Sequence, residues 1–177
     1  MEEGDDDFEC VAVMNGHSQD VKSVKFHPTK EVNRIFKFFT CKILNPFLKK
    51  LLASASYDDT IKFWQDDDDN WICTSTLMNH TSTVWDIAFS QDGNTLFSCS
   101  DDETVIVWKL GDDDKYHLAT TLTGYHKRAI YSISVNHQNY IATGCGDNGI
   151  RVFVPVSRIF LLFLYYSFFL IFLPSGG

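Results

Sequence analysis

Residues 98–108 read SCSDDETVIVW, and this stretch decides the fold because the chain carries two further copies of it. Residues 54–64 read SASYDDTIKFW, and residues 143–153 read TGCGDNGIRVF. The copies are offset by 44 and 45 residues. Self-similarity at a fixed period of this length predicts an architecture built from structural repeats.

A histidine stands upstream of each copy, and a β-branched residue follows it four positions later. These pairs are His17 and Val21, His80 and Val84, and His126 and Ile130. In the second repeat, short runs of alternating apolar residues separated by polar turns predict four strands. The predicted strands cover residues 71–77, 84–90, 95–100 and 104–109.

Four-stranded antiparallel units spaced about 40–45 residues apart are typical of β-propeller blades. The sequence therefore predicts an all-β fold, a partial propeller of about three four-stranded blades. The repeats are expected over about 8–64, 71–108 and 116–153. Residues 8–13 are expected to form an outer strand that belongs to a preceding blade, and a closed propeller would need further repeats.

These repeats resemble the WD-repeat family over most of the chain, with the segments 32–50 and 154–177 left out. The resemblance rests on the Gly-His elements at 15–17 and 124–126 and on the Trp endings at 63–64 and 107–108. Gln65 and Lys109 replace the usual final Asp of that ending, and Phe153 replaces the Trp of the third repeat.

The resemblance implies a hydrogen-bonded tetrad of His, Ser or Thr, turn Asp and Trp in each repeat. By position the three sets are His17, Ser54, Asp58 and Trp64, then His80, Ser98, Asp102 and Trp108, then His126, Thr143 and Asp147 with Phe153. Phe153 has no N–H group, so the third set is expected to be incomplete. A Ser-His-Asp catalytic triad is the alternative, but a nucleophile site has no reason to recur in every repeat. We therefore expect structural tetrads and no enzyme activity.

The composition divides the chain into an acidic main part and two foreign pieces, which are the segments 32–50 and 154–177 that contain no acidic residue. The whole chain has 177 residues and a net charge of −8. Residues 32–50 and 154–177 hold 9 of the 15 Phe, 6 of the 15 basic residues and no acidic residue. The rest of the chain therefore carries nine basic and 23 acidic residues, a net charge of −14. This charge argues against a nucleic-acid partner.

The two foreign pieces have more than one interpretation. Residues 32–50 interrupt the WD-repeat region at 1–153 and read either as a cationic amphipathic loop or as a translated intron. The hydrophobic tail at 154–177 reads as intron readthrough, as a genuine tail that tethers a WD module to a membrane, or as a blade strand. Its apolar run at 159–173 is shorter than the roughly 20 residues that span a bilayer. A membrane partner is therefore not favoured.

The cysteines indicate reduced thiols, and the first residues of the sequence indicate no export signal. The five cysteines contain no CxxC pair, which predicts structural thiols, no metal site and no cofactor. Residues 1–7 have neither a basic nor an apolar signal-peptide region.

Acidic clusters precede the outer strands at 2–7, 66–69 and 112–114. Together with HSQDVK at 17–22, LLASASYDDT at 51–60 and GYHKRAIY at 124–131, they resemble the WD-repeat subunit of the cytosolic iron-sulfur protein assembly machinery. The resemblance implies a scaffold of the cytosolic, and also nuclear, targeting complex. Its partners would be the subunits of that complex and apoprotein clients.

In WD proteins the top rim is formed by the residues three and five after the His and by the residue before the turn Asp. The resemblance thus implies a partner-binding rim made of Asp20, Lys22, Tyr57, Thr83, Trp85, Asp101 and Tyr131, with Ala129 and Gly146 completing the third blade. Aromatic and charged residues of this kind are frequent hot spots in protein interfaces. The alternative is that Trp85 and Tyr131 simply cover the blade.

Overall fold

The computed structural model describes residues 8–28, 50–67 and 70–156, which form eleven strands and no helix. The strands are β1 (Val21–Phe26), β2 (Leu51–Ser56), β3 (Ile61–Asp67), β4 (Asn70–Leu77), β5 (Val84–Phe89), β6 (Thr95–Ser100), β7 (Val105–Leu110), β8 (Tyr116–Leu122), β9 (Ile130–Val135), β10 (Ile141–Cys145) and β11 (Ile150–Phe153). The predicted all-β class is confirmed.

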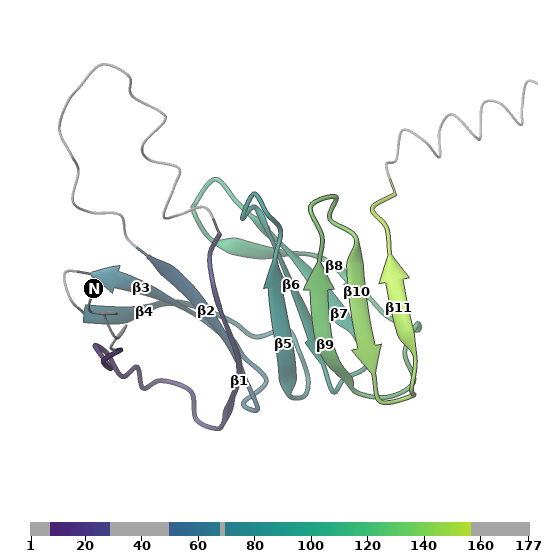
Figure 1. Cartoon of the computed structure of the whole chain (residues 1–177), viewed down its shortest axis with the longest axis horizontal. Helices are drawn as coiled ribbons and strands as arrows, with labels where there is room; N and C mark the ends of the chain where they lie inside the picture. Colours follow the sequence, from purple (N-terminus) through teal and green to yellow (C-terminus); the bar gives the residue numbers. More distant parts are fainter. Residues whose placement is uncertain (1–7, 29–49, 68–69, 157–177) are drawn as a thin grey trace, which may run out of the picture.

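The strands form three antiparallel sheets in the orders β1-β2-β3-β4, β5-β6-β7-β8 and β9-β10-β11. Figure 1 shows the sheets side by side, with β5 between β1 and β9. In each sheet the chain starts at the strand that faces the neighbouring sheets and then moves outward by hairpins. This arrangement is that of a partial β-propeller, as the sequence predicts.

The strands β4 and β8 link successive repeats. Each stands at the start of a repeat in the sequence, yet β4 pairs with β3 and β8 pairs with β7 of the preceding repeat. Every four-stranded sheet therefore takes its outer strand from the next repeat. This overlap ties neighbouring sheets together through the backbone.

Tight turns between the second and third strands of each sheet explain the repeated Asp motif. The residue after the turn Asp has a positive φ in all three repeats, at Asp59 (64°), Glu103 (67°) and Asn148 (65°). Asn and Asp tolerate this left-handed conformation better than most residues. The strands that precede the first two of these turns, β2 and β6, are buried along their whole length.

The core lies between adjacent sheets, where the inner strand of one sheet packs on the middle strands of its neighbour. Ile87 of β5 packs with Ala55 and Phe63 of the first sheet. Ile133 of β9 packs with Val105 of the second sheet. Burial of such side chains, worth about 1.5–3 kcal/mol each, joins the blades.

Two expectations about strands are wrong. Residues 8–13 form no strand, because the described chain offers no preceding sheet edge with which they could pair. The third sheet has three strands in place of four, since the described part of the chain supplies no outer strand next to β11.

The insertion at 32–50 lies outside the described residues except for Lys50, and the tail at 154–177 lies outside them beyond residue 156. The connection from β1 to β2 runs from residue 27 to residue 50, whereas the much shorter segments 90–94 and 136–140 connect β5 to β6 and β9 to β10. Its two ends are adjacent, because the His27 N–H donates a 2.8 Å hydrogen bond to the carbonyl of Leu51. Among the described ranges, none holds a helix of the length and apolarity that crossing a bilayer requires.

Candidate partner-binding surface

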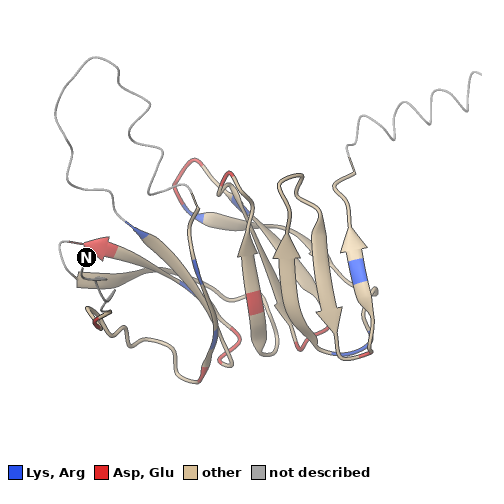
Figure 2. Ribbon diagram, in the orientation of Figure 1, with Lys and Arg blue, Asp and Glu red and all other residues tan. Residues whose placement is uncertain are grey.

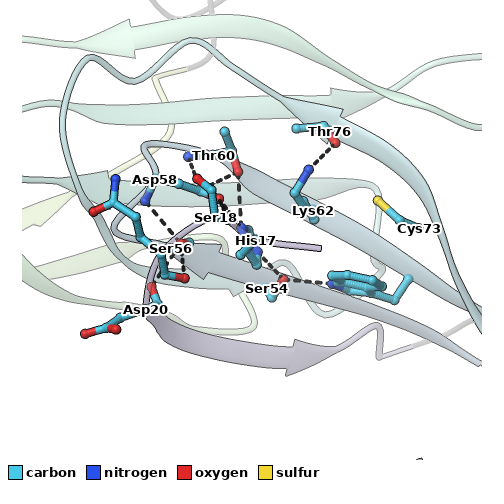
Figure 3. Close-up of polar contacts among 12 residues, drawn as sticks. His17, Ser18, Asp20, Ser54, Ser56, Asp58, Thr60, Lys62, Cys73 and Thr76 are labelled. Atoms are coloured by element: carbon cyan, nitrogen blue, oxygen red, sulfur yellow. Dashed lines mark hydrogen bonds and ion pairs between the residues drawn. The ribbon is translucent and has the colours of Figure 1, made fainter. Parts of the chain in front are cut away.

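The first tetrad forms a continuous hydrogen-bonded chain, shown in Figure 3. Trp64 Nε1 donates to Ser54 Oγ at 2.8 Å, and Ser54 Oγ lies 2.7 Å from His17 Nε2. His17 Nδ1 lies 2.8 Å from Asp58 Oδ2. Gly16 permits this arrangement, because a Cβ at that position would stand 2.7 Å from the ring of Trp64. The Gly-His element is therefore explained by close packing on the indole.

The second tetrad repeats the same geometry. Trp108 Nε1 donates to Ser98 Oγ at 2.9 Å, Ser98 Oγ lies 2.8 Å from His80 Nε2, and His80 Nδ1 lies 2.8 Å from Asp102 Oδ2. The indole can only donate, so Ser98 accepts from Trp108 and shares a further hydrogen bond with His80 Nε2. His80 Nδ1–H then donates to the carboxylate.

The turn Asp of each complete tetrad accepts several hydrogen bonds besides the one from its His. Asp102 also accepts hydrogen bonds from the Thr104 hydroxyl at 2.7 Å and from the backbone N–H groups of Thr104 and Thr81. Burial alone would raise the pKa of Asp102, but hydrogen bonds from His80 and Thr104 outweigh it and lower the pKa to about 2. The same balance of burial against hydrogen bonds from Thr60, Ser18 and His17 lowers the pKa of Asp58.

The third set departs from the expected arrangement. His126 Nε2 lies 2.9 Å from Thr143 Oγ1, but its Nδ1 is buried without a hydrogen-bond partner. Asp147 instead binds Arg151 through two contacts of 3.0 and 2.5 Å. The inclusion of Asp147 in the third tetrad is therefore wrong. Burial and the Arg151 charge both lower the pKa of His126.

The local sequence explains this departure. Gly149 stands where the first two repeats have Thr60 and Thr104, so the turn lacks the hydroxyl that binds the Asp. Arg151 follows two residues after Gly149, in β11, and its guanidinium can bind both oxygens of a carboxylate. The absence of a Trp at position 153 is visible in the sequence, whereas spacing does not reveal the competition by Arg151.

The predicted rim residues are held in pairs by a bond that recurs in every repeat. The backbone N–H of the residue before the turn Asp donates to the carbonyl of the residue three after the His. The pairs are Tyr57 with Asp20, Asp101 with Thr83, and Gly146 with Ala129, each at 2.9 Å. The repeat thus fixes the rim positions of all three sheets in the same way.

Four of the rim side chains come together across the three sheets, and we call Lys22, Tyr57, Trp85 and Tyr131 the rim cluster. Lys22 Nζ lies 5.4 Å from the ring centre of Tyr57 and 5.5 Å from that of Trp85. The rings of Trp85 and Tyr131 meet edge to face at 5.3 Å. Lys22, Trp85 and Tyr131 occupy the same position on β1, β5 and β9, so the side-by-side inner strands place them in one row.

The rim cluster remains accessible although its members touch one another. Tyr57 and Tyr131 are 49% and 51% exposed, whereas Trp85 is partly buried. Cation–π and edge-to-face contacts hold the side chains in place without covering their outer surfaces. A preorganised group of two tyrosines, a tryptophan and a lysine suits recognition of a protein surface.

The other predicted rim residues differ in their exposure to solvent. Asp20 is exposed and forms an ion pair of 3.1 Å with Lys22, so it adjoins the rim cluster. Asp101 is exposed and accepts a hydrogen bond from Ser82 at 3.3 Å. Thr83 is buried, so its inclusion as a contact residue is wrong. Burial follows from its place under the turn, where its carbonyl accepts the Asp101 N–H.

Asp86 connects the three sheets and was not singled out from the sequence. Its Oδ1 accepts a hydrogen bond from Ser23 of β1 at 2.7 Å, and its Oδ2 accepts one from the backbone N–H of Ile133 of β9 at 3.1 Å. Figure 2 shows the resulting acidic band within β5. The sequence does contain one signal for Asp86, because it is the single charged residue of the inner strand β5.

The described residues offer no group of three or more His, Cys, Asp or Glu side chains arranged to hold a metal ion. Within the same ranges Cys99 and Cys145 are buried, and Cys10 and Cys73 are exposed. Burial raises the pKa of the Cys99 thiol. This thiol is therefore packed as a small apolar group.

A sequence profile described as WD domain, G-beta repeat, matches residues 8–65, 71–109 and 117–153. The chain belongs to the WD-repeat family. The matched segments contain both complete tetrads and the rim cluster. These sites therefore lie within the WD repeats themselves.

Several curated proteins resemble this WD-repeat chain. A probable cytosolic iron-sulfur protein assembly protein CIAO1 homolog of Ixodes scapularis is 40% identical over 81% of the chain and 40% of its own length. A probable cytosolic iron-sulfur protein assembly protein Ciao1 of Aedes aegypti is 41% identical over 55% of the chain and 33% of its own length. A probable cytosolic Fe-S cluster assembly factor of Schizosaccharomyces pombe is 35% identical over 84% of the chain and 32% of its own length. The WD-repeat chain thus spans less than half the length of each of these relatives.

Proposed function

We propose that this WD-repeat chain is a non-enzymatic scaffold of the cytosolic iron-sulfur protein assembly machinery. The observation that carries the proposal is the rim cluster, in which Lys22, Trp85 and Tyr131 from three successive repeats form one preorganised surface. The named role of the relatives in iron-sulfur protein assembly supplies the process.

The proposal excludes catalysis because the serine hydroxyl groups of the two complete tetrads are already hydrogen-bonded. A nucleophilic Ser needs a free approach to substrate, but Ser98 is fully buried and bonded to both Trp108 and His80. Ser54 has the same two kinds of partner in the first repeat. These groups stabilise the blades and leave neither hydroxyl available for chemistry.

The partners proposed for the rim cluster are subunits of the iron-sulfur targeting complex and its apoprotein clients, in the cytosol and also in the nucleus. Tyr57 and Tyr131 offer apolar faces with polar tips, which suits the partly wet contacts of protein interfaces. Lys22 adds a positive charge that Asp20 partly balances. The cluster therefore favours a partner that combines an apolar side chain with an acceptor group.

Affinity capture of the tagged chain from cells of its source, followed by quantitative mass spectrometry, tests the assignment to this process. The proposal predicts enrichment of cytosolic iron-sulfur assembly proteins over capture with an unrelated WD-repeat chain. Enrichment of membrane proteins alone, or of no iron-sulfur component, would contradict it.

A further inference from the structure

The first two repeats place the turn Asp between two donors of the loop that carries the His. Asp102 Oδ2 lies 2.8 Å from His80 Nδ1 and accepts the backbone N–H of Thr81 at 3.1 Å. The first repeat places its Asp in the same way, between the His and the N–H that follows it. A carboxylate oxygen therefore has a built position in each of these repeats.

The third repeat leaves this position without its own carboxylate. Both oxygens of Asp147 bind Arg151, at 3.0 and 2.5 Å. His126 is 3% exposed, and among the described residues its Nδ1 has no hydrogen-bond partner. A buried polar atom without a partner is unfavourable, so the ion pair with Arg151 outweighs a cost that the other two repeats avoid.

Gly149 permits this ion pair. A Cβ at position 149 would stand 2.7 Å from Arg151 Nη1 and 2.9 Å from Asp147 Oδ1, so the guanidinium would have to move. The first two repeats have Thr60 and Thr104 at this position, and their hydroxyl groups donate to the turn Asp at 2.6 and 2.7 Å. Two arrangements of Asp147 are therefore available, and the residue at position 149 favours one of them.

The ion pair lies toward a neighbouring sheet that the structure describes. Phe153, on the same face of β11 as Arg151, packs against the core shared by the second and third sheets. The side chains of Arg151 and Asp147 are 28% and 17% exposed. A group that approaches from solvent can therefore reach the guanidinium.

The surroundings of Arg151 are basic in a chain that is otherwise acidic. The three residues after the His and the four residues of the turn include three acidic and no basic residue in each of the first two repeats. In the third repeat the same positions contain one acidic residue, Asp147, and two exposed basic residues, Lys127 and Arg128. The loop lies against the turn, because the Cys145 thiol donates to the Arg128 carbonyl at 3.2 Å. This local charge attracts acidic groups.

We propose that Arg151 binds an acidic side chain of a protein partner, and that this side chain displaces Asp147. The partner carboxylate takes over the guanidinium, and Asp147 turns to His126 Nδ1 and the N–H of Lys127, as in the first two repeats. Binding of the partner and completion of the buried Asp–His contact are thus coupled. The inference rests on the proposed scaffold function and adds an acidic segment as the class of partner.

Isothermal titration calorimetry of the full chain with a short, end-blocked polyglutamate peptide tests the site. Arg151→Gln is expected to weaken binding by about tenfold, the loss of roughly one charge-assisted contact. Lys62→Gln is the matched control, because Lys62 holds the same position in the first repeat and binds Thr76 there. It should bind the peptide as the wild-type chain does. Equal affinity of the wild-type chain and Arg151→Gln would overturn the proposal.

Two variants that release Arg151 test the displacement of Asp147. Gly149→Thr restores the hydroxyl group of the other repeats, and Asp147→Asn removes the competing charge. Each variant that is folded by circular dichroism should bind the peptide more tightly than the wild-type chain does. Affinity unchanged in the folded variants would show that Asp147 does not compete for Arg151.

The ¹⁵N chemical shift of His126 Nδ1 provides a readout of the coupling. Peptide should change this shift in the wild-type chain, and Gly149→Thr should show the changed shift without peptide. Binding that leaves the shift unaltered would overturn the coupling. Capture of iron-sulfur assembly proteins by a chain that binds no peptide would overturn this inference alone. Peptide binding with no such capture would support the Arg151 site and count against the proposed process.

Discussion

The Ser23 hydroxyl of β1 donates a 2.7 Å hydrogen bond to the carboxylate of Asp86 on β5. The same carboxylate accepts the N–H of Ile133 on β9 and lies 3.8 Å from Lys25 Nζ. One acidic side chain thus joins the inner strands of three consecutive sheets. Those strands also carry three of the four residues of the rim cluster, so Asp86 helps to fix the spacing of Lys22, Trp85 and Tyr131.

Asp86→Ala is expected to lower the free energy of unfolding by about 1–3 kcal/mol, because Ser23 and the Ile133 N–H lose their acceptor in a largely buried place. Urea denaturation measures the loss. Asp101→Ala removes an exposed carboxylate from the neighbouring turn and serves as the control, with an expected change within about 0.5 kcal/mol. Equal losses in the two variants would show that the connection between sheets does not depend on Asp86.

Ser98→Ala should lower the free energy of unfolding by about 1–3 kcal/mol, because Trp108 Nε1 and His80 Nε2 both lose their buried partner. Ser134→Ala, at an exposed position of β9, is the matched control and should leave the urea midpoint unchanged. A variant that folds as well as the wild-type chain but loses a hydrolytic activity would support the catalytic interpretation instead.

Acid should weaken the second blade over a defined range of pH. The pKa of Asp102 is about 2 in the folded chain and 3.8 ordinarily, so the unfolded state takes up the proton first as the pH falls. The stability contributed by this carboxylate is fully present above about pH 4 and is lost as the pH falls toward 2. Unfolding free energies of the wild-type chain and of Asp102→Asn should therefore converge between pH 4 and 2. Parallel curves would contradict the assignment.

Deletion of residues 32–50 is expected to preserve the first sheet. It shortens the connection between β1 and β2 to residues 27–31, which matches the length of the connections at 90–94 and 136–140 in the other two sheets. The hydrogen bond between His27 and Leu51 already brings its ends together, and closure entropy changes by only about 0.6 kcal/mol per doubling of length. Circular dichroism and solubility of the deleted chain test this. Loss of the β signal would show that the segment is needed for folding.

The sequence predicted the fold well because the determining signals are local and occur three times. The His, the hydroxyl residue, the turn Asp and the Trp each follow from spacing, and the structure brings together the first two sets. Local patterns do not reveal competition between side chains, so the capture of Asp147 by Arg151 could not be seen from spacing alone. The same limit applies to Asp86, whose partners are 63 and 47 residues away in the sequence.

Residues 8–13 show a different limit of sequence reasoning. Their pattern predicts an outer strand, but a strand forms only when an edge is available for pairing. The pattern describes what these residues can do, whereas the described sheets determine whether they do it.

The most direct measurement is a comparison of captured partners between two aromatic variants of the tagged chain. Tyr131→Ala combined with Trp85→Ala removes the central aromatic pair of the rim cluster, and Tyr140→Ala removes an exposed tyrosine of the connection between β9 and β10. With both variants folded by circular dichroism, the rim variant is predicted to lose most of the captured iron-sulfur assembly proteins, while Tyr140→Ala retains them. Undiminished capture by the folded rim variant would contradict the proposed role of this surface.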